Sequence, residues 1–283
     1  MPPEVRFEKW QALGNDYVIV ERDGLPWELS PTRIRRICEP HFGLAADGIL
    51  LLSPASDPAH VAELRIFNPD GSEAELSGNG ARQAVLYLRC SGWTEDDEFT
   101  ILTRAGEVHP RITGPHSATL EMGRASLHSP DFPSGGEDGR GVVTAGGREW
   151  RFQHVSIGNP QCVIEAGDEL ERLDLGTIGP AIENSDLFPN RTNVSFVRFD
   201  SDRIRVRIFE RGVGETLSSG TGASGAAVAA FLHGAPSPFT VALDGGELGV
   251  EVSPDLDVKV TGDAKPVFTG VLSAELVREL ADL

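Results

Sequence analysis

A twenty-residue pattern that occurs twice is the feature that most constrains this chain. The first copy spans residues 65–84, and the second begins at Arg207. Aligned without gaps, the copies share an Arg-Ile-Phe run, one glutamate, one serine, two glycines and two alanines. The shared serines, Ser77 and Ser219, lie 142 positions apart in a chain of 283 residues. Two equivalent halves are the economical explanation of a repeat at this distance.

Each copy predicts a strand, a turn and then a glycine-containing helix start. The Arg-Ile-Phe run is β-prone, and the glycines of Ser-Gly-x-Gly-Ala let the backbone approach a ligand closely. A helix start offers free N–H groups and partial positive charge, which suit a carboxylate or a phosphate. If the halves are related by a pseudo-dyad, both helix starts meet one anion, with Ser77 and Ser219 on opposite sides of it. That is a geometry for two-base chemistry.

The charge of the chain excludes some partners. Its formal net charge is −18 and its pI is near 4.7, whereas nucleic acids and anionic membranes bind basic surfaces. The first residues carry no signal-peptide pattern, and no apolar run approaches the length of a membrane span. We therefore expect a cytoplasmic protein that binds a small molecule rather than nucleic acid or membrane.

The metal-binding and nucleophilic side chains are few and scattered. The three cysteines, Cys38, Cys90 and Cys162, form neither a disulfide framework nor a zinc pattern, and the histidines show no ligand spacing. None of the three lysines lies beside the glycine-rich segments, where a pyridoxal Schiff base would need one. We expect chemistry without a metal or an organic cofactor.

Hydrophobic periodicity and turn residues predict the remaining elements. Helices are expected at residues 32–39, 81–88, 223–232 and 273–283, with a helical region at 168–184 that is interrupted at Gly176 and at Gly179-Pro180. Strands are expected on both sides of Gly14-Asn15-Asp16 within 5–20, and at 49–52, 65–67, 99–103, 107–112, 118–122, 151–157, 162–165, 194–199, 203–209 and within 239–268. Residues 126–147, rich in Pro, Gly and Ser, read as the connection between the halves.

Several short motifs, in their order along the chain, resemble the diaminopimelate epimerase family over essentially the whole sequence. They are Gly14-Asn15-Asp16, Phe67-Asn68-x-Asp70-Gly71-Ser72-Glu73, Gly78-Asn79-Gly80-Ala81-Arg82, Gly158-Asn159-Pro160, Thr192-Asn193-Val194, Glu210-Arg211-Gly212-x-Gly214-Glu215-Thr216 and Gly220-Thr221-Gly222-Ala223. The resemblance implies a cofactor-free isomerase that interconverts LL- and meso-diaminopimelate, a precursor of lysine and peptidoglycan, by two-base proton transfer.

The resemblance also implies the fold, an α/β (α+β) protein of two pseudo-symmetric domains. Each domain is expected to be a mixed β-sheet or barrel wrapped around a central helix, with the active site in the interdomain cleft. We place the first domain at residues 1–124, joined by the C-terminal helix 270–283, and the second at residues 125–269. Assembly as a homodimer is left open.

The substrate contacts follow from the same resemblance. In that family the distal end of diaminopimelate is gripped by residues matching Asn15, Asn68, Asn159, Asn193, Glu210 and Arg211. A carboxylate binds an ammonium group and a guanidinium binds a carboxylate bidentately, so Glu210 beside Arg211 suits a zwitterionic end. The positions that hold the reacting α-carboxylate are matched by Gly78, Asn79, Gly220 and Thr221.

This chain departs from the family pattern at the acid and the base. The family has cysteine where this chain has Ser77 and Ser219. A hydroxyl ionises far less readily than a thiol, whose pKa is about 8.5, and serine needs an adjacent base. The histidine that follows Gly-Asn-Pro in the family is Gln161 here, which leaves Glu210 as the nearby general base. Asn68 occupies the matching position of the first repeat, so the two halves are not equally equipped.

Several explanations remain for serine at both positions. An engineered pair would trap ligand without turnover, but further departures at Gln83, Gln161, Ser218 and Ser224 favour a natural variant.

The function also has alternatives. Related cofactor-free families, similar to proline racemase, include epimerases and dehydratases of cyclic imino acids, and this chain could belong with them. A catalytically impaired protein that only binds diaminopimelate is a further alternative.

Overall fold

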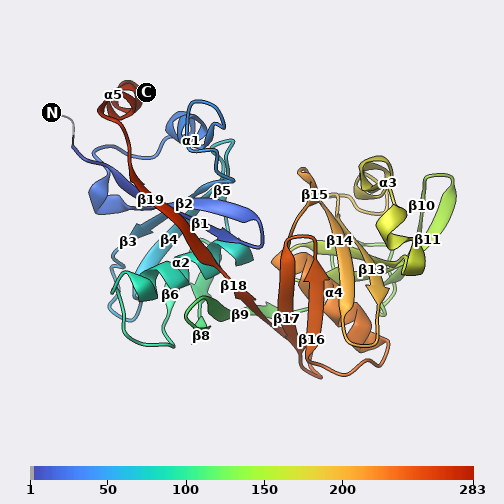
Figure 1. Ribbon diagram of the computed structural model, residues 1–283. Helices are drawn as coiled ribbons and strands as arrows, with labels where there is room; N and C mark the ends of the chain where they lie inside the picture. The colour runs from blue at the N-terminus through green and yellow to red at the C-terminus, as the bar shows by residue number, and fades with distance from the viewer. Residues whose placement is uncertain (1–2) are drawn as a thin grey trace. The chain divides into compact units, whose positions relative to one another are not determined.

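The computed structural model describes residues 3–283, and the chain divides into two compact units (Figure 1). Unit 1 comprises the described residues up to Leu120 together with Gly262–Leu283, and unit 2 comprises Glu121–Thr261. The boundaries expected from the sequence, after residues 124 and 269, lie farther along the chain. The chain crosses from one unit to the other inside two strands, β9 (Ser117–Arg124) and β18 (Asp257–Asp263), so no turn marks either crossing in the sequence.

Unit 1 is built on a sheet with the strand order β19-β1-β2-β3-β4-β6-β7, and β5 pairs with β4. The β2–β3 and β4–β6 pairs are parallel, and the other neighbours are antiparallel. Its strands are β1 (Arg6–Ala12), β2 (Asn15–Glu21), β3 (Ile49–Ser53), β4 (Ala62–Phe67), β5 (Glu73–Ala74), β6 (Ile101–Thr103), β7 (Gly106–Val108) and β19 (Lys265–Val271). Its helices are η1 (Arg22–Gly24, a 3-10 helix), α1 (Pro31–Cys38), α2 (Gly78–Cys90) and α5 (Ala274–Asp282).

The second sheet follows the order β10-β11-β12-β13-β14-β16-β17-β18-β9-β8, and β15 pairs with β14. Its further strands are β8 (Arg111–Gly114), β10 (Arg140–Ala145), β11 (Arg148–Ser156), β12 (Pro160–Glu165), β13 (Asn193–Phe199), β14 (Ile204–Glu210), β15 (Gly214–Thr216), β16 (Phe239–Leu243) and β17 (Gly246–Val252). The helices of unit 2 are η2 (Gly167–Arg172, a 3-10 helix), α3 (Leu175–Glu183) and α4 (Gly220–Leu232).

The two sheets repeat one topology. The strand path β1-β2-β3-β4-β6-β7 of unit 1 recurs in unit 2 as β11-β12-β13-β14-β16-β17. The parallel pairs recur as β12–β13 and β14–β16, and the short strands β5 and β15 pair at matching places. A 13-residue helix, α2 or α4, follows each short strand. The sequence repeat is therefore one segment of a duplicated α+β domain, and the predicted fold class is confirmed.

Helices α2 and α4 are buried on nearly all sides. In α4, an apolar run of alanine, valine and glycine leaves no polar face, and such a helix must be enclosed. It contacts strands β11 to β14 as well as β16 and β17, whereas α2 contacts β1 to β3. Across residues 3–283, no helix has the length and the apolar character of a membrane span.

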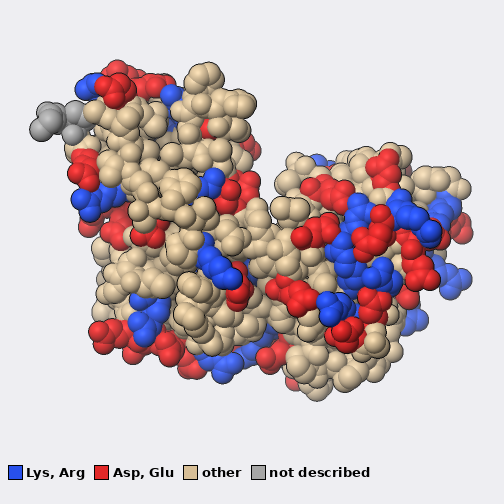
Figure 2. All heavy atoms as spheres, viewed as in Figure 1, with Lys and Arg blue, Asp and Glu red and all other residues tan. Residues whose placement is uncertain are grey.

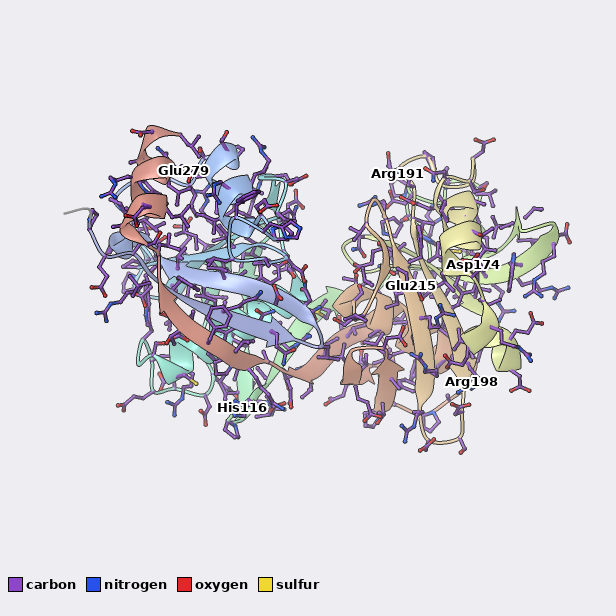
Figure 3. All side chains as sticks on the ribbon, turned by 45° about the horizontal axis from the view of Figure 1, so that its top comes forward. His116, Asp174, Arg191, Arg198, Glu215 and Glu279 are labelled. Atoms are coloured by element: carbon purple, nitrogen blue, oxygen red, sulfur yellow. The ribbon has the colours of Figure 1, made fainter. Side chains whose placement is uncertain are left out.

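Other helices pack elsewhere on each unit. In unit 1, α1 and α5 share a core cluster with β1 to β3, and Arg36 of α1 pairs with Glu279 of α5 at 2.6 Å. Glu279 is labelled on α5 in Figure 3. In unit 2, α3 joins an aromatic cluster that includes Trp150, Phe188 and Phe196. The C-terminal helix thus belongs to unit 1.

The repeated arginine and glutamate form the same ion pair in each unit. Arg65 of β4 donates to Glu73 of β5 at 2.9 Å, and Arg207 of β14 donates to Glu215 of β15 at 2.6 Å. The pairs join β4 to β5 and β14 to β15, the short strands that precede helices α2 and α4. More widely, acidic and basic side chains are interleaved over the visible face of unit 2 (Figure 2).

Two sequence-based predictions about elements were wrong. The expected strand 107–112 is split into β7 and β8, because Pro110 between them has no N–H group for a ladder. The expected interruptions at Gly176 and at Gly179-Pro180 are absent, since α3 runs through all three residues. Gly179 is required by packing instead: a Cβ there would lie 2.5 Å from the ring of Phe209.

Gly48 provides a test of the packing between β2, β3 and β4. A Cβ at this buried position would overlap the backbone carbonyl oxygen of Phe67 and lie 2.6 Å from Cε1 of Tyr17. Because a backbone atom can shift only at a cost in strain energy, we expect Gly48→Ala to lower the free energy of unfolding by about 1–3 kcal/mol.

Urea unfolding followed by circular dichroism measures this loss. The control is Gly24→Ala, because no atom lies within 4 Å of a Cβ built at Gly24. Equal midpoints for the two variants would contradict the packing described here.

Candidate active site

Ser77 is the N-cap residue of α2. Its backbone is extended, with φ −132° and ψ 120°, and its Oγ accepts a hydrogen bond from the N–H of Gly80 at 3.1 Å. The hydroxyl of Tyr17 also donates to this oxygen, at 3.4 Å. Serine is a favoured N-cap because its short side chain satisfies a free N–H group of the first turn. The half-exposed Ser77 oxygen therefore receives two donors.

Ser219 is the N-cap residue of α4 and is more buried, with 6% of its surface exposed. Its Oγ accepts from the N–H of Gly222 at 3.2 Å and lies 3.4 Å from Oγ1 of Thr221. The Ser219 hydroxyl also lies close enough to the Glu210 carboxylate to lower the pKa of that group. A serine oxygen in contact with a carboxylate has a base that can accept its proton.

Glu210, the last residue of β14, is partly buried. Burial raises the pKa of its carboxyl group above the ordinary value, and hydrogen bonds from Thr216 and Ser219 oppose this rise. The bond from the Thr216 hydroxyl measures 2.8 Å. A carboxylate with a raised pKa is a stronger base than an exposed one, so Glu210 suits general-base work.

The remaining candidates of unit 2 are tied together by amide side chains. Asn159 donates to Oγ1 of Thr221 at 3.3 Å and accepts from Gln161 at 2.6 Å. Asn193 accepts from the backbone N–H of Arg211 at 2.9 Å and donates to the carbonyl of Pro160 at 3.0 Å. The starts of β12, β13 and α4 thus meet the end of β14 at one place, which brings these predicted residues together.

Glu183 was not found from the sequence, although it shapes this region. The buried carboxylate, at the end of α3, accepts from Arg191 at 3.0 Å and from the backbone N–H of Gly212 at 2.8 Å. Arg191 is labelled in Figure 3. It therefore fixes the turn that follows Glu210 and Arg211. The guanidinium of Arg211 donates to the carbonyl of Asn190 at 3.0 Å. A glutamate inside a predicted helix carries no sequence signal for such a role.

In unit 1, the predicted residues Asn15 and Asn68 lie in separate local networks. The side-chain amide of Asn15 donates to Asp47 at 2.8 Å, and the backbone carbonyl of Asn15 accepts from Gln83 of α2 at 3.0 Å. Asn68 donates to Ser72 within its own turn, at 2.9 Å. Asn15 is thus linked to the helix that Ser77 caps.

Asn79 is buried, and its side-chain oxygen accepts from the guanidinium of Arg82. The amide oxygen is therefore already engaged, whereas Gly78 and Asn79 occupy the first turn, where backbone N–H groups have no helical acceptor. Burial lowers the pKa of Arg82 to about 10, and two of its guanidinium nitrogens have no hydrogen-bond partner. The charge of Asp263 acts on Arg82 in the opposite sense and raises its pKa. A cation this near the start of α2 adds to the positive potential there.

The chain matches a known family over most of its length. The family model described as diaminopimelate epimerase matches residues 7–128 and 153–267. The chain is 39% identical over 282 residues to a diaminopimelate epimerase of Synechococcus sp. (strain JA-3-3Ab), covering 95% of this chain and 99% of that protein. It is 40% identical over 278 residues to the diaminopimelate epimerase of Moorella thermoacetica, covering 94% and 98%.

Solved structures share the fold at lower identity. A hydroxyproline epimerase from Agrobacterium vitis, with bound trans-4-hydroxy-L-proline, has a TM-score of 0.67 at 18% identity, covering 95% of this chain and 91% of that chain. A PhzF-family phenazine biosynthesis protein from Bacillus anthracis has a TM-score of 0.68 at 18% identity, covering 95% and 99%.

The capping role of the two serines gives a test that needs no substrate. Ser77→Ala and Ser219→Ala each remove the acceptor for a first-turn N–H group, so we expect each to lower the free energy of unfolding by about 1 kcal/mol. Ser30→Ala, which uncaps α1, is the matched control for an ordinary cap. Urea unfolding and amide exchange at Gly80 and Gly222 measure the effect. Unchanged exchange at both glycines would show that the hydroxyls do not cap.

Proposed function

This chain belongs to the diaminopimelate epimerase family, and from that premise we propose that it interconverts LL- and meso-diaminopimelate by two-base proton transfer. Ser77 and Ser219 exchange the Cα proton, and no cofactor takes part. The reaction would serve the supply of lysine and peptidoglycan precursors. A cytoplasmic location and assembly as a homodimer stay predictions.

The contact between Ser219 and Glu210 is the observation that carries this proposal. A serine hydroxyl alone is too weak a base to remove a Cα proton. With Glu210 in contact, the Ser219 oxygen takes the Cα proton while its own proton passes to the carboxylate. Ser77 then delivers its hydroxyl proton to the opposite face of the same carbon. The inversion therefore requires Ser77 and Ser219 to engage one substrate.

The helix starts are the proposed site of the reacting α-carboxylate. Gly78 and Asn79 begin α2, and Gly220 and Thr221 begin α4. Free N–H groups and the partial positive charge at each start favour an anion, and a carbanion at Cα places further negative charge on that carboxylate. The same groups therefore bind the ground state and stabilise the charge that develops.

The distal end of the substrate is assigned to the polar network around Arg211. A zwitterionic end needs a cation for its carboxylate and acceptors for its ammonium group. The backbone of Arg211 is held by Asn193, and the turn after it is held by Glu183. Asn15, Asn68 and Asn159 supply the amide contacts.

Exchange of the Cα proton in deuterium oxide tests the reaction. We expect wild-type protein to bind both stereoisomers in isothermal titration and to incorporate deuterium at Cα. The rate should rise with pH as Glu210 ionises, with a midpoint above the ordinary value for glutamate, because burial raises the pKa of this group.

Glu210→Gln should lower exchange by about 100-fold or more, the usual size of a general-base contribution. The control is Glu247→Gln, which removes a surface partner of Arg203 and should leave exchange unchanged. Failure to bind either isomer would end the diaminopimelate assignment. Binding without any deuterium uptake would favour a protein that only binds the ligand.

A second variant separates diaminopimelate from cyclic imino acids, which have no distal ammonium or carboxylate group. We expect Arg211→Ala to raise the KM for diaminopimelate at least about tenfold, because a charge-assisted bidentate contact is lost. Arg203→Ala, which alters a surface ion pair, is the matched control. An unchanged KM in Arg211→Ala, with activity retained, would favour an imino-acid epimerase instead.

A further inference from the structure

The two serines differ in the proton chemistry of their neighbours. The Ser219 hydroxyl meets a carboxylate, which accepts a proton. The Ser77 oxygen meets two donors, the N–H of Gly80 at 3.1 Å and the hydroxyl of Tyr17 at 3.4 Å. Because both neighbours donate, the proton of Ser77 is left free to point elsewhere. An oxygen that accepts two hydrogen bonds is also stabilised in its ionised form.

Tyr17 is held firmly in the position from which it contacts Ser77. It lies in β2, directly across from Trp10 of β1, and 5% of its surface is exposed. The backbone of Gly48 packs against the edge of its ring so closely that a Cβ there would lie 2.6 Å from Cε1. A buried phenol needs a partner for its hydroxyl group, and Ser77 provides one. The ring therefore has little freedom to turn the hydroxyl away.

The position of Tyr17 suits a proton donor for Ser77. The resemblance indicates no general base beside Ser77, because Asn68 stands where the second repeat has Glu210. A phenol has a pKa near 10, between those of a carboxyl group and a serine hydroxyl. Such a group can return a proton to a serine oxygen.

We propose that Tyr17 is the proton partner of Ser77, so that this chain works with a Ser77–Tyr17 pair on one face of the substrate and a Ser219–Glu210 pair on the other. This assignment rests on the proposed epimerase function. Tyr17 acts through Ser77, and is a positioning residue and proton relay rather than a group that touches the substrate.

The proton transfers balance in a simple way. Glu210 receives a proton through Ser219 when the Cα–H bond breaks. Ser77 gives its hydroxyl proton to the carbanion, and the Tyr17 hydroxyl gives its proton to the Ser77 oxygen. The protein is left with a protonated Glu210 and an ionised Tyr17. One proton passes to solvent from Glu210 and one is taken up by Tyr17, which restores the starting state.

The first test does not depend on any substrate. In a Cys90→Ser background, which removes the exposed native thiol, Ser77→Cys introduces a thiol at the same helix start. The pH dependence of its alkylation by iodoacetamide is compared with and without Tyr17→Phe. We expect loss of the phenol to raise the midpoint of thiol ionisation by about one pH unit, since a donor to the thiolate is lost. Arg82 and the helix start are unchanged in both proteins, so the difference reports Tyr17. An unchanged midpoint would overturn the proposal.

The second test uses deuterium exchange with the otherwise native chain. Tyr17→Phe should slow inversion at least about tenfold, while one stereoisomer still exchanges its Cα proton through Ser219 and Glu210. The control is Tyr87→Phe, another tyrosine of unit 1, whose hydroxyl donates to Glu21. Inversion should be unaffected in this control.

The outcomes separate the two proposals. Normal inversion in Tyr17→Phe would remove Tyr17 from the mechanism and leave the epimerase assignment standing. In contrast, a wild-type protein that neither binds nor exchanges diaminopimelate would end that assignment, and the thiol midpoint would still decide whether Tyr17 acts on the Ser77 position.

Discussion

The hydrogen bond from a first-turn N–H group to a serine oxygen, made once at each central helix, is the interaction on which the rest of the site depends. It fixes Ser77 to α2 and Ser219 to α4, and both helices are enclosed by their sheets. A cap residue has extended backbone, so its side chain lies at the edge of the buried helix rather than inside it. The same oxygen is thereby held by the fold and presented beside the free N–H groups that suit a carboxylate. Fold stability and the proposed chemistry share one atom in each unit.

Duplication explains the matching backbones, and divergence explains the different side chains. Both units place a short strand, an Arg–Glu ion pair and a capped helix in the same order. The neighbours of the two caps differ, since a carboxylate lies beside Ser219 and a hydrogen-bond donor, the Tyr17 hydroxyl, lies beside Ser77. An inversion removes a proton from one face of the carbon and delivers a proton to the other. It therefore needs a proton acceptor on one face and a proton donor on the other. Serine, which ionises with difficulty, depends on these neighbours more than a thiol would.

The repeat, the strands that flank it and the two helix starts could be predicted because local patterns determine them. Ser-Gly-x-Gly-Ala after a β-prone run leaves few conformations, and the topology of both units agrees with that prediction. The contacts of the sites could not be predicted in the same way. Glu183 reaches Gly212 from another element, and Tyr17 reaches Ser77 across sixty residues of sequence. The helix through Gly179-Pro180 was missed because the ring of Phe209, distant in sequence, requires a glycine there.

The proposed inversion requires Ser77 and Ser219 to approach one carbon from opposite faces. A crystal structure of the wild-type protein with a slowly reacting diaminopimelate analogue would test this arrangement. We expect both Oγ atoms within about 3–3.5 Å of Cα, on opposite sides, with the α-carboxylate at the starts of α2 and α4. An analogue bound with only one serine near Cα, or with both serines on the same face, would contradict it.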